Sequence, residues 1–293
     1  MQRRNNGAMD TRRRWMAVAC AMGLVGPGLV EAVQQPALTA APAADEIVTK
    51  NADARGGVEA WRKVQTMAWA GHVESANAST HRLPFMLGAK RPNKTRFEIV
   101  ADRQRSTRVF DGESGWKVRV DGAGKSDVQP YSDAEARFAR GAAVLDGPLM
   151  DYVARGAVIS LEGLDTVDER KAYRLAVKLP SGGHQRVWID AETYLELRHD
   201  REQRSESGQA TVVSMYFRDY QDFDGLKVPT SIETRSAAGG ASNKLIVERV
   251  ALNPNLDDRM FARPDAAAAR HRGVVIDTRQ PSTAAGPAAA MQR

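Results

Sequence analysis

The chain has 293 residues, and its 42% hydrophobic and 27% charged content is that of a soluble globular protein, not of a disordered or polytopic one. Residues 1–32 carry a net charge of +3 and residues 265–293 carry +2, so only +1 of the total of +6 remains for residues 33–264. Aromatic residues make up 6%, and nucleic-acid binding needs clustered cations and stacking rings on the fold itself, so we expect no nucleic-acid partner.

The first 32 residues are predicted to be a secretory signal peptide. Three arginines at 12–14 precede an uncharged run over 15–30, and residues 30–32 offer a small-residue cleavage site. An uncleaved membrane anchor is the alternative, although a membrane span needs about 20 residues. Residues 11–16 resemble a twin-arginine export signal and residues 17–20 resemble a lipobox, so the export route and a lipid-anchored form stay open.

The remaining chain is predicted to hold one folded domain between two irregular segments. Cleavage after Ala32 removes Cys20, the only cysteine, and with it disulfides, thiol nucleophiles and cysteine-based zinc sites. Residues 33–44 are rich in proline and alanine, which is typical of a linker, and residues 265–293 are predicted to form a disordered tail. The domain therefore spans residues 45–264.

This domain begins with a helix and continues mostly as strands. Apolar residues at helical spacing predict a helix over 46–55 and a short turn over 59–64. Ser132 and Glu135 have the spacing of a capping box for a helix over 133–145, and a further turn or two is predicted over 148–154. A period of two residues predicts strands over 67–74, 81–87, 95–99, 116–120, 157–163, 171–179, 185–190, 194–201, 210–220, 226–236 and 243–252.

These elements predict a mainly β (α+β) fold of about 11 or 12 antiparallel strands in a meander, with one helical insertion and no βαβ unit. A long sheet with one apolar face and few helices either closes into a barrel or leaves an apolar cleft. Trp69, Phe85, Phe97 and Trp116 are expected on the apolar face of consecutive strands. Ordinary core packing is the alternative to a ligand-lining role for the apolar candidates, which are Trp69, Phe85, Phe97, Trp116, Val118, Leu175, Val177, Met215 and Phe217.

Catalytic and metal-binding patterns are scarce. The sequence contains no nucleophile elbow, zinc-protease motif, P-loop or dinucleotide fingerprint. His72 and His81, and likewise His184 and His199, lie on neighbouring predicted strands, where surface histidines are the simpler interpretation than a metal site. The carboxylates occur at predicted turns and strand edges, where they cap backbone groups or face water. We therefore expect no metal and no cofactor.

Several short motifs, in this order, resemble the family of outer-membrane lipoprotein-sorting proteins, the LolA-like carriers. They span residues 45–264 and each consists largely of turn residues: NADARGG at 51–57, KRPN at 90–93 followed by Phe97, DGESGW at 111–116, DAETYL at 190–195, YQDFDGLKVP at 220–229, and LNP at 252–254 followed by Leu256, Asp257, Asp258, Phe261 and Pro264.

The resemblance implies an unclosed, strongly curved antiparallel barrel with helices as a lid, and a soluble periplasmic carrier that shields lipid or lipoprotein acyl chains. It also implies partners among the inner- and outer-membrane lipoprotein-sorting components. Arg91 resembles the arginine that in the sorting carrier bonds to lid backbone and holds the empty cavity shut; the alternative is a strand-edge cation paired with a carboxylate. Arg91→Leu is expected to leave the fold intact and to impair ligand release or transfer.

The sequence is longer than the compact carriers of that family and has extra turns, which leaves other functions open. A periplasmic sensor or interaction protein on the same fold is the first alternative, and a cofactor-free enzyme is the second. The cargo, the partner proteins and the oligomeric state do not follow from the sequence.

Overall fold

A computed structural model describes residues 42–75, 82–101, 103–204, 208–237 and 242–263. The predicted signal peptide, the predicted tail, most of the predicted linker and His81 lie outside these residues. No helix in the described part of the chain has the length and apolar character needed to cross a membrane.

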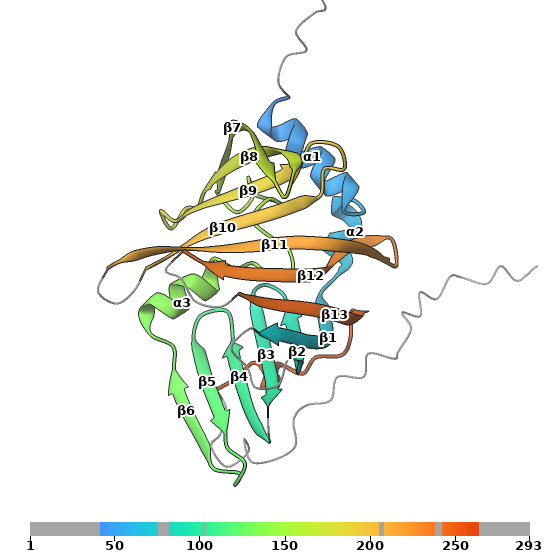
Figure 1. Ribbon diagram of the computed structural model, residues 1–293. Helices are drawn as coiled ribbons and strands as arrows, with labels where there is room; N and C mark the ends of the chain where they lie inside the picture. The colour runs from blue at the N-terminus through green and yellow to red at the C-terminus, as the bar shows by residue number, and fades with distance from the viewer. Residues whose placement is uncertain (1–41, 76–81, 102, 205–207, 238–241, 264–293) are drawn as a thin grey trace, which may run out of the picture. The chain divides into compact units, whose positions relative to one another are not determined.

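The described residues form three α-helices, one short 3₁₀-helix and thirteen strands (Figure 1). The helices are α1 (Ala44–Ala54), α2 (Val58–Lys63), α3 (Asp133–Arg140) and η1 (Asp258–Met260). The strands are β1 (Thr66–Ser75), β2 (Leu83–Lys90), β3 (Lys94–Ala101), β4 (Gln104–Phe110), β5 (Gly115–Val120), β6 (Ser126–Pro130), β7 (Val158–Val167), β8 (Arg170–Lys178), β9 (His184–Asp190), β10 (Glu196–Arg204), β11 (Ala210–Phe223), β12 (Leu226–Ser236) and β13 (Asn243–Leu252).

All the described strands belong to one antiparallel sheet that is not closed, as predicted. Its order is β6-β5-β4-β3-β2-β1-β13-β12-β11-β10-β9-β8-β7, so β6 and β7 are its two edges. Each half is a meander of hairpins, and the pairing of β1 with β13 joins the halves. The two strands that sequence analysis missed are β4 and β6, whose polar sequences QRSTRVF and SDVQP lack a clear apolar alternation.

The helical insertion between β6 and β7 is shorter than predicted. The capping box is confirmed, because the Ser132 side chain accepts from the Glu135 amide and the Glu135 carboxylate accepts from the Ser132 amide. The helix nevertheless ends at Arg140, and residues 148–154 form turns, not helix. Ala143, Gly147 and Asp151 have positive φ angles, which a continuous right-handed helix does not permit.

The strand register gives the sheet two different faces. Paired residues of antiparallel strands point to the same side of the sheet. Leu175 of β8 pairs with Val187 of β9, and both side chains belong to one buried cluster with Ile47 and Val48 of α1. We call this side the inner face. The helices α1, α2 and α3 and residues 141–157 pack against it, and we refer to these elements as the cover.

The sheet curves around the cover. Glu135 of α3 accepts hydrogen bonds from Lys117 of β5, at 2.9 and 3.2 Å, while Arg201 of β10 contacts Phe138 of the same helix. These strands are eight positions apart in the sheet order. An eight-residue helix is only about 12 Å long, so both ends of the sheet must turn toward α3 (Figure 1).

The opposite side, the outer face, is crossed by the segment that follows β13. Thr66 Oγ1 donates to the Pro254 carbonyl at 2.6 Å, Lys90 Nζ donates to the Leu256 carbonyl at 2.9 Å, and Arg96 donates to the Met260 carbonyl at 3.3 Å. Phe261 at the end of this segment is fully buried. Strands β1, β2 and β3 are therefore covered on their outer face as well.

Candidate functional site

The inner face carries seven of the nine predicted ligand-lining residues. Trp69, Phe85 and Phe97 lie on one part of it, in the cluster that includes Trp61 of α2 and Leu145 of the cover. The register from β8 to β11 places the other four on the same face: Leu175, Val177, Met215 and Phe217.

Trp116 and Val118 lie on the outer face, so the expectation that the four aromatic residues share one face is wrong for Trp116. Phe97 pairs with Arg108 of β4, whereas Trp116 pairs with Val109 of the same strand. Arg108 and Val109 are adjacent and point to opposite sides. The apolar row of β5 thus faces the outer side, whereas the expectation placed every apolar row on one side of the sheet.

The inner face is not uniformly covered. Leu175 and Val177 beneath α1 are 0% and 1% exposed and belong to a closed core. On the central strands, Trp69, Phe85 and Val247 are also buried, whereas a second group of apolar residues on the same face is only half-buried. We call these half-buried residues the apolar stripe: Phe97, Ile99, Leu83, Leu87, Leu245, Ile232, Phe217 and Met215. Strand β1 lies between β2 and β13 and contributes the buried Trp69 and Val73 to the same face.

Arg91, in the turn between β2 and β3, connects the sheet to the cover. Its Nε donates to the Val64 carbonyl at 2.7 Å and an Nη donates to the Trp61 carbonyl at 3.1 Å, at the end of α2. Its other Nη is 2.6 Å from Asp146 Oδ2, and the two side chains are 21% and 18% exposed. Arg91 therefore bonds to backbone at the end of α2 and also pairs with a carboxylate, and its role in ligand release stays a prediction.

The rest of the KRPN turn makes similar connections. Asn93 Nδ2 donates to the Arg140 carbonyl at 3.0 Å, at the end of α3, and Lys90 forms an ion pair of 2.9 Å with Asp258 on the outer face. One hairpin turn thus holds α2, α3 and the segment after β13 against the sheet.

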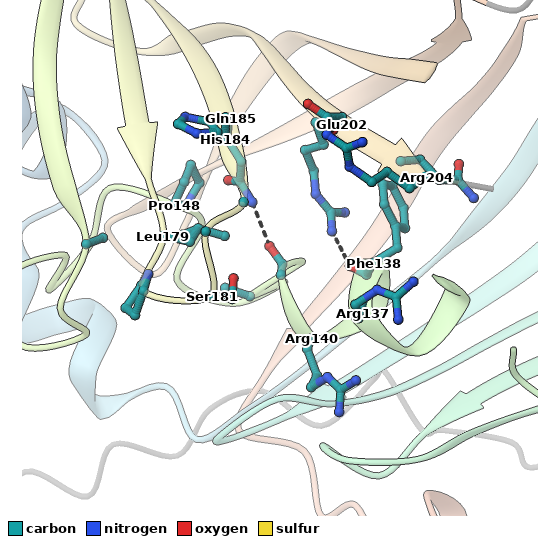
Figure 2. A pocket seen from close by; sticks show the side chains of 18 of the residues that line it. Arg137, Phe138, Arg140, Pro148, Leu179, Ser181, His184, Gln185, Glu202 and Arg204 are labelled. Carbon is teal, nitrogen blue, oxygen red and sulfur yellow. Dashed lines mark hydrogen bonds and ion pairs between the residues drawn. The ribbon is translucent and has the colours of Figure 1, made fainter. Parts of the chain in front are cut away.

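A pocket of about 590 Å³ lies between the cover and strands β9 and β10 (Figure 2). Arg137 and Phe138 of α3 line one side, and Leu179, Ser181 and Gln185 around the β8–β9 turn line the other. Pro148 of the cover completes the wall. The described residues that line it include none of the nine predicted candidates, and sequence analysis did not find this pocket.

The pocket is basic. Its lining includes five arginines and one carboxylate, Glu202, a net charge of +4. Arg204 is ion-paired with Glu202. The others, Arg137, Arg140, Arg155 and Arg201, come from α3, the cover and β10. Because they are up to 64 positions apart, only the fold reveals their proximity, and no local motif signals it.

A chain of buried hydrogen bonds lies behind the arginines. Gln185 Nε2 donates to the Gly141 carbonyl at 3.1 Å, so its Oε1 faces His199 Nε2 at 2.9 Å and that ring nitrogen carries the proton. Burial, and secondarily the charge of Arg201, lowers the pKa of His199 to about 3. Burial lowers the pKa of Arg201 to about 10. His199 is therefore a neutral structural residue at physiological pH.

The structure does not bring the histidines into a ligand set. His199 pairs with Val187 and faces Gln185, whereas His72 on β1 is 2.8 Å from Glu248. Within the described residues, no group of three or more potential ligands is arranged to hold a metal ion.

The chain is similar to several solved structures. No family model and no curated protein matches the chain. A LolA superfamily protein from Nitrosomonas europaea is 15% identical, with 76% of this chain and 98% of that one covered and a TM-score of 0.49. A domain assigned to outer membrane lipoprotein sorting, from Vibrio parahaemolyticus, is 13% identical, with 77% and 97% covered and a TM-score of 0.48. A DUF1329 family protein from Desulfovibrio piger is 15% identical, with 73% and 97% covered and a TM-score of 0.47.

The solved structures to which this chain is similar thus include a LolA superfamily protein and a lipoprotein-sorting domain, the family that the sequence motifs resemble. At such identities no residue role is transferred from them to this chain.

Proposed function

We propose that this protein is a periplasmic carrier that holds the acyl chains of a lipid or lipoprotein between the apolar stripe and the cover, for lipoprotein sorting toward the outer membrane. The observation that supports the proposal is the apolar stripe itself. Leu87, Phe97 and Ile99 lie on the face that the cover closes, yet they stay half-buried instead of forming a sealed core. An incompletely filled apolar layer inside a fold is the surface that an acyl chain requires.

The energetics of acyl chains explain why such a carrier is needed and why its cover must move. Each methylene exposed to water costs about 0.8 kcal/mol, so a long chain does not leave a membrane without a protein surface to receive it. Entry beneath the cover requires α2 and residues 141–157 to separate from the sheet. The contacts of Arg91 with Val64, Trp61 and Asp146 are the ones that this movement breaks.

Organic extraction of the native protein tests the proposal directly. The protein is purified from periplasm without detergent, and mass spectrometry is applied to a solvent extract. We expect acyl lipid or lipopeptide in stoichiometric amount. A clean extract, together with no binding of an added fluorescent fatty acid, would contradict the carrier and favour the sensor or interaction protein.

The two faces of the sheet supply matched variants for the same test. Phe97→Ser removes a half-buried ring from the apolar stripe, and Trp116→Ser removes a half-buried ring from the outer face. We expect fatty-acid affinity to fall about tenfold in Phe97→Ser, since burying a large apolar side chain is worth roughly 1.5–3 kcal/mol, and to stay unchanged in Trp116→Ser. Equal effects in the two variants would place the ligand elsewhere.

A further inference from the structure

The basic pocket, hereafter the arginine pocket, concentrates charge in a nearly neutral domain. Its five arginines and Glu202 give +4, whereas all of residues 33–264 together carry +1. Surface arginines of this protein mostly have partners, as Arg174 and Arg186 do with Glu162. In the arginine pocket, by contrast, four of the five arginines, all but Arg204, form no ion pair with a described residue.

Arg201 is the most buried of these four arginines. It is 6% exposed, and a terminal nitrogen donates to the Phe138 carbonyl while its guanidinium carbon lies 3.8 Å from the centre of the Phe138 ring. Its buried Nε has no hydrogen-bond partner, and no described carboxylate lies within 4.0 Å. Burying a cation without a counter-ion costs several kcal/mol, so an unpaired guanidinium at a pocket wall indicates an anion that binds there.

Arg155 repeats the arrangement from the cover. One of its terminal nitrogens donates to the carbonyls of Gly147 and Pro148, at 2.9 and 3.0 Å. Its Nε is also buried without a hydrogen-bond partner, and in the described part of the chain it forms no ion pair. Two guanidinium groups thus line one pocket, each anchored by backbone carbonyls and each with an unused donor.

We propose that the arginine pocket binds an oxyanion, a phosphate or carboxylate, whose charge offsets Arg201 and Arg155, and that this oxyanion is the headgroup of the cargo lipid. A guanidinium matches the geometry of both oxyanions and forms two parallel hydrogen bonds with them. Phe138, Pro148 and Leu179 supply apolar wall for the first carbons beyond the headgroup. The identity of the ligand as a lipid rests on the carrier function proposed above, whereas the oxyanion site does not.

Calorimetric titration of the mature protein with three probes separates these claims. The probes are dioctanoylphosphatidylglycerol, which has an anionic headgroup, dioctanoylglycerol, which has the same chains without charge, and inorganic phosphate. We expect dioctanoylphosphatidylglycerol to bind 10- to 100-fold more tightly than dioctanoylglycerol, because a hydrogen bond to a charged group contributes about 1.5–3 kcal/mol. Sodium chloride should weaken the binding of the anionic lipid only.

Arg201→Met removes the buried charge and keeps most of the side-chain volume. It should lower affinity for dioctanoylphosphatidylglycerol by 10- to 100-fold and leave dioctanoylglycerol unchanged. Arg198→Met is the matched control, because Arg198 is on the same strand, points to the outer face and is paired with Asp200. Arg137→Gln/Arg140→Gln, at exposed positions of the pocket, is the second test and does not disturb buried contacts. This double variant should lower the affinity for dioctanoylphosphatidylglycerol several-fold.

Each result decides between the two proposals. Equal affinity for the two lipids, with no effect of Arg201→Met or of the double variant, would overturn the oxyanion site and leave the carrier standing. Binding of phosphate alone, lost in Arg201→Met, would support the oxyanion site with a free anion as ligand and overturn the carrier. An absence of binding by all three probes would overturn both.

Discussion

Two arginines hold the cover against the inner face, and they differ in one respect. Arg91 and Arg201 both extend from the sheet, both are largely buried, and both donate to backbone carbonyls of the cover. Arg91 also has Asp146 at 2.6 Å, whereas Arg201 has no carboxylate within 4.0 Å among the described residues. Arg91 thus has its counter-ion within the protein, whereas Arg201 has an unpaired charge and an Nε donor without a partner.

The difference assigns different tasks to the two ends of the cover. A guanidinium with a buried carboxylate partner contributes to holding a segment in place, and removing either partner leaves the other charge uncompensated. A guanidinium without one is better suited to an external anion. We therefore expect substitutions near Arg91 to act mainly on stability and opening, and substitutions near Arg201 to act mainly on binding.

Arg91→Leu should have the largest effect on stability, lowering the free energy of unfolding by about 3 kcal/mol because it leaves Asp146 partly buried and unpaired. The fold should remain, and the Trp61 and Val64 region of α2 should exchange its amide hydrogens faster. Urea unfolding followed by tryptophan fluorescence and hydrogen exchange measure these effects.

The double variant Arg91→Leu/Asp146→Leu provides the control for the ion pair. It should recover part of the loss, since the unpaired carboxylate is also removed. Losses that simply add would show that the pair contributes nothing beyond the separate contacts.

Protonation of His199 should have the next largest effect. Its pKa is about 3 in the folded protein against 6.5 unfolded, so the unfolded chain binds the extra proton and stability is lost as pH falls below 6.5. Between pH 7.5 and pH 5 the loss is about 2 kcal/mol. His199→Gln keeps a donor toward Gln185 and removes the titration, so wild type should lose about 2 kcal/mol more than this variant over that range. Parallel pH profiles would contradict the prediction.

The pH dependence caused by His199 also tests the difference between Arg91 and Arg201. Burial is the larger cause of the lowered pKa of His199, and the charge of Arg201 is the second cause, which a bound anion would offset. Saturating phosphate or anionic lipid should therefore reduce the difference between wild type and His199→Gln at pH 5, while Arg91→Leu should leave it unchanged.

The sequence predicted the Arg91 end of the molecule much better than the Arg201 end. Alternating apolar residues are a local signal, so the meander, the capping box at Ser132 and the elements packed around Trp69 and Phe85 were predictable. The KRPN turn is recognisable as a motif, and its Lys90, Arg91 and Asn93 side chains bond to backbone carbonyls or carboxylates. Local patterns and compact motifs are what a single sequence conveys.

The Arg201 end depends on curvature, which is not a local property. Arg201 meets Phe138 only because the strands between β5 and β10 turn toward α3. The polar strand β4 also has no clear apolar alternation, and the apolar row of β5 with Trp116 and Val118 faces the outer side, which the sequence does not indicate. A residue such as Arg201 on the strand sequence ELRHDREQR resembles any solvated cation until its surroundings are known.

Removing the N-cap of α3 should lower stability by a smaller amount, and it should affect the Arg91 end and the Arg201 end of the cover alike. Ser132→Ala eliminates the side-chain acceptor for the Glu135 amide and should lower the unfolding free energy by about 1 kcal/mol. Ser132→Asp keeps an acceptor and should remain near wild type. If Ser132→Asp loses as much as Ser132→Ala, the hydroxyl acts through another contact and the cap is not the cause.

Arg201→Met should have the smallest effect on stability, within about 1 kcal/mol of wild type. It loses one hydrogen bond and the contact with the Phe138 ring, but it also eliminates the cost of burying an unpaired charge. Urea unfolding in phosphate-free buffer measures the change, with Arg91→Met as the comparison of equal chemistry. A loss in Arg201→Met as large as in Arg91→Met would show that both arginines are structural ties. A small loss, together with reduced stabilisation by phosphate or anionic lipid, would show that Arg201 is held in place for a ligand.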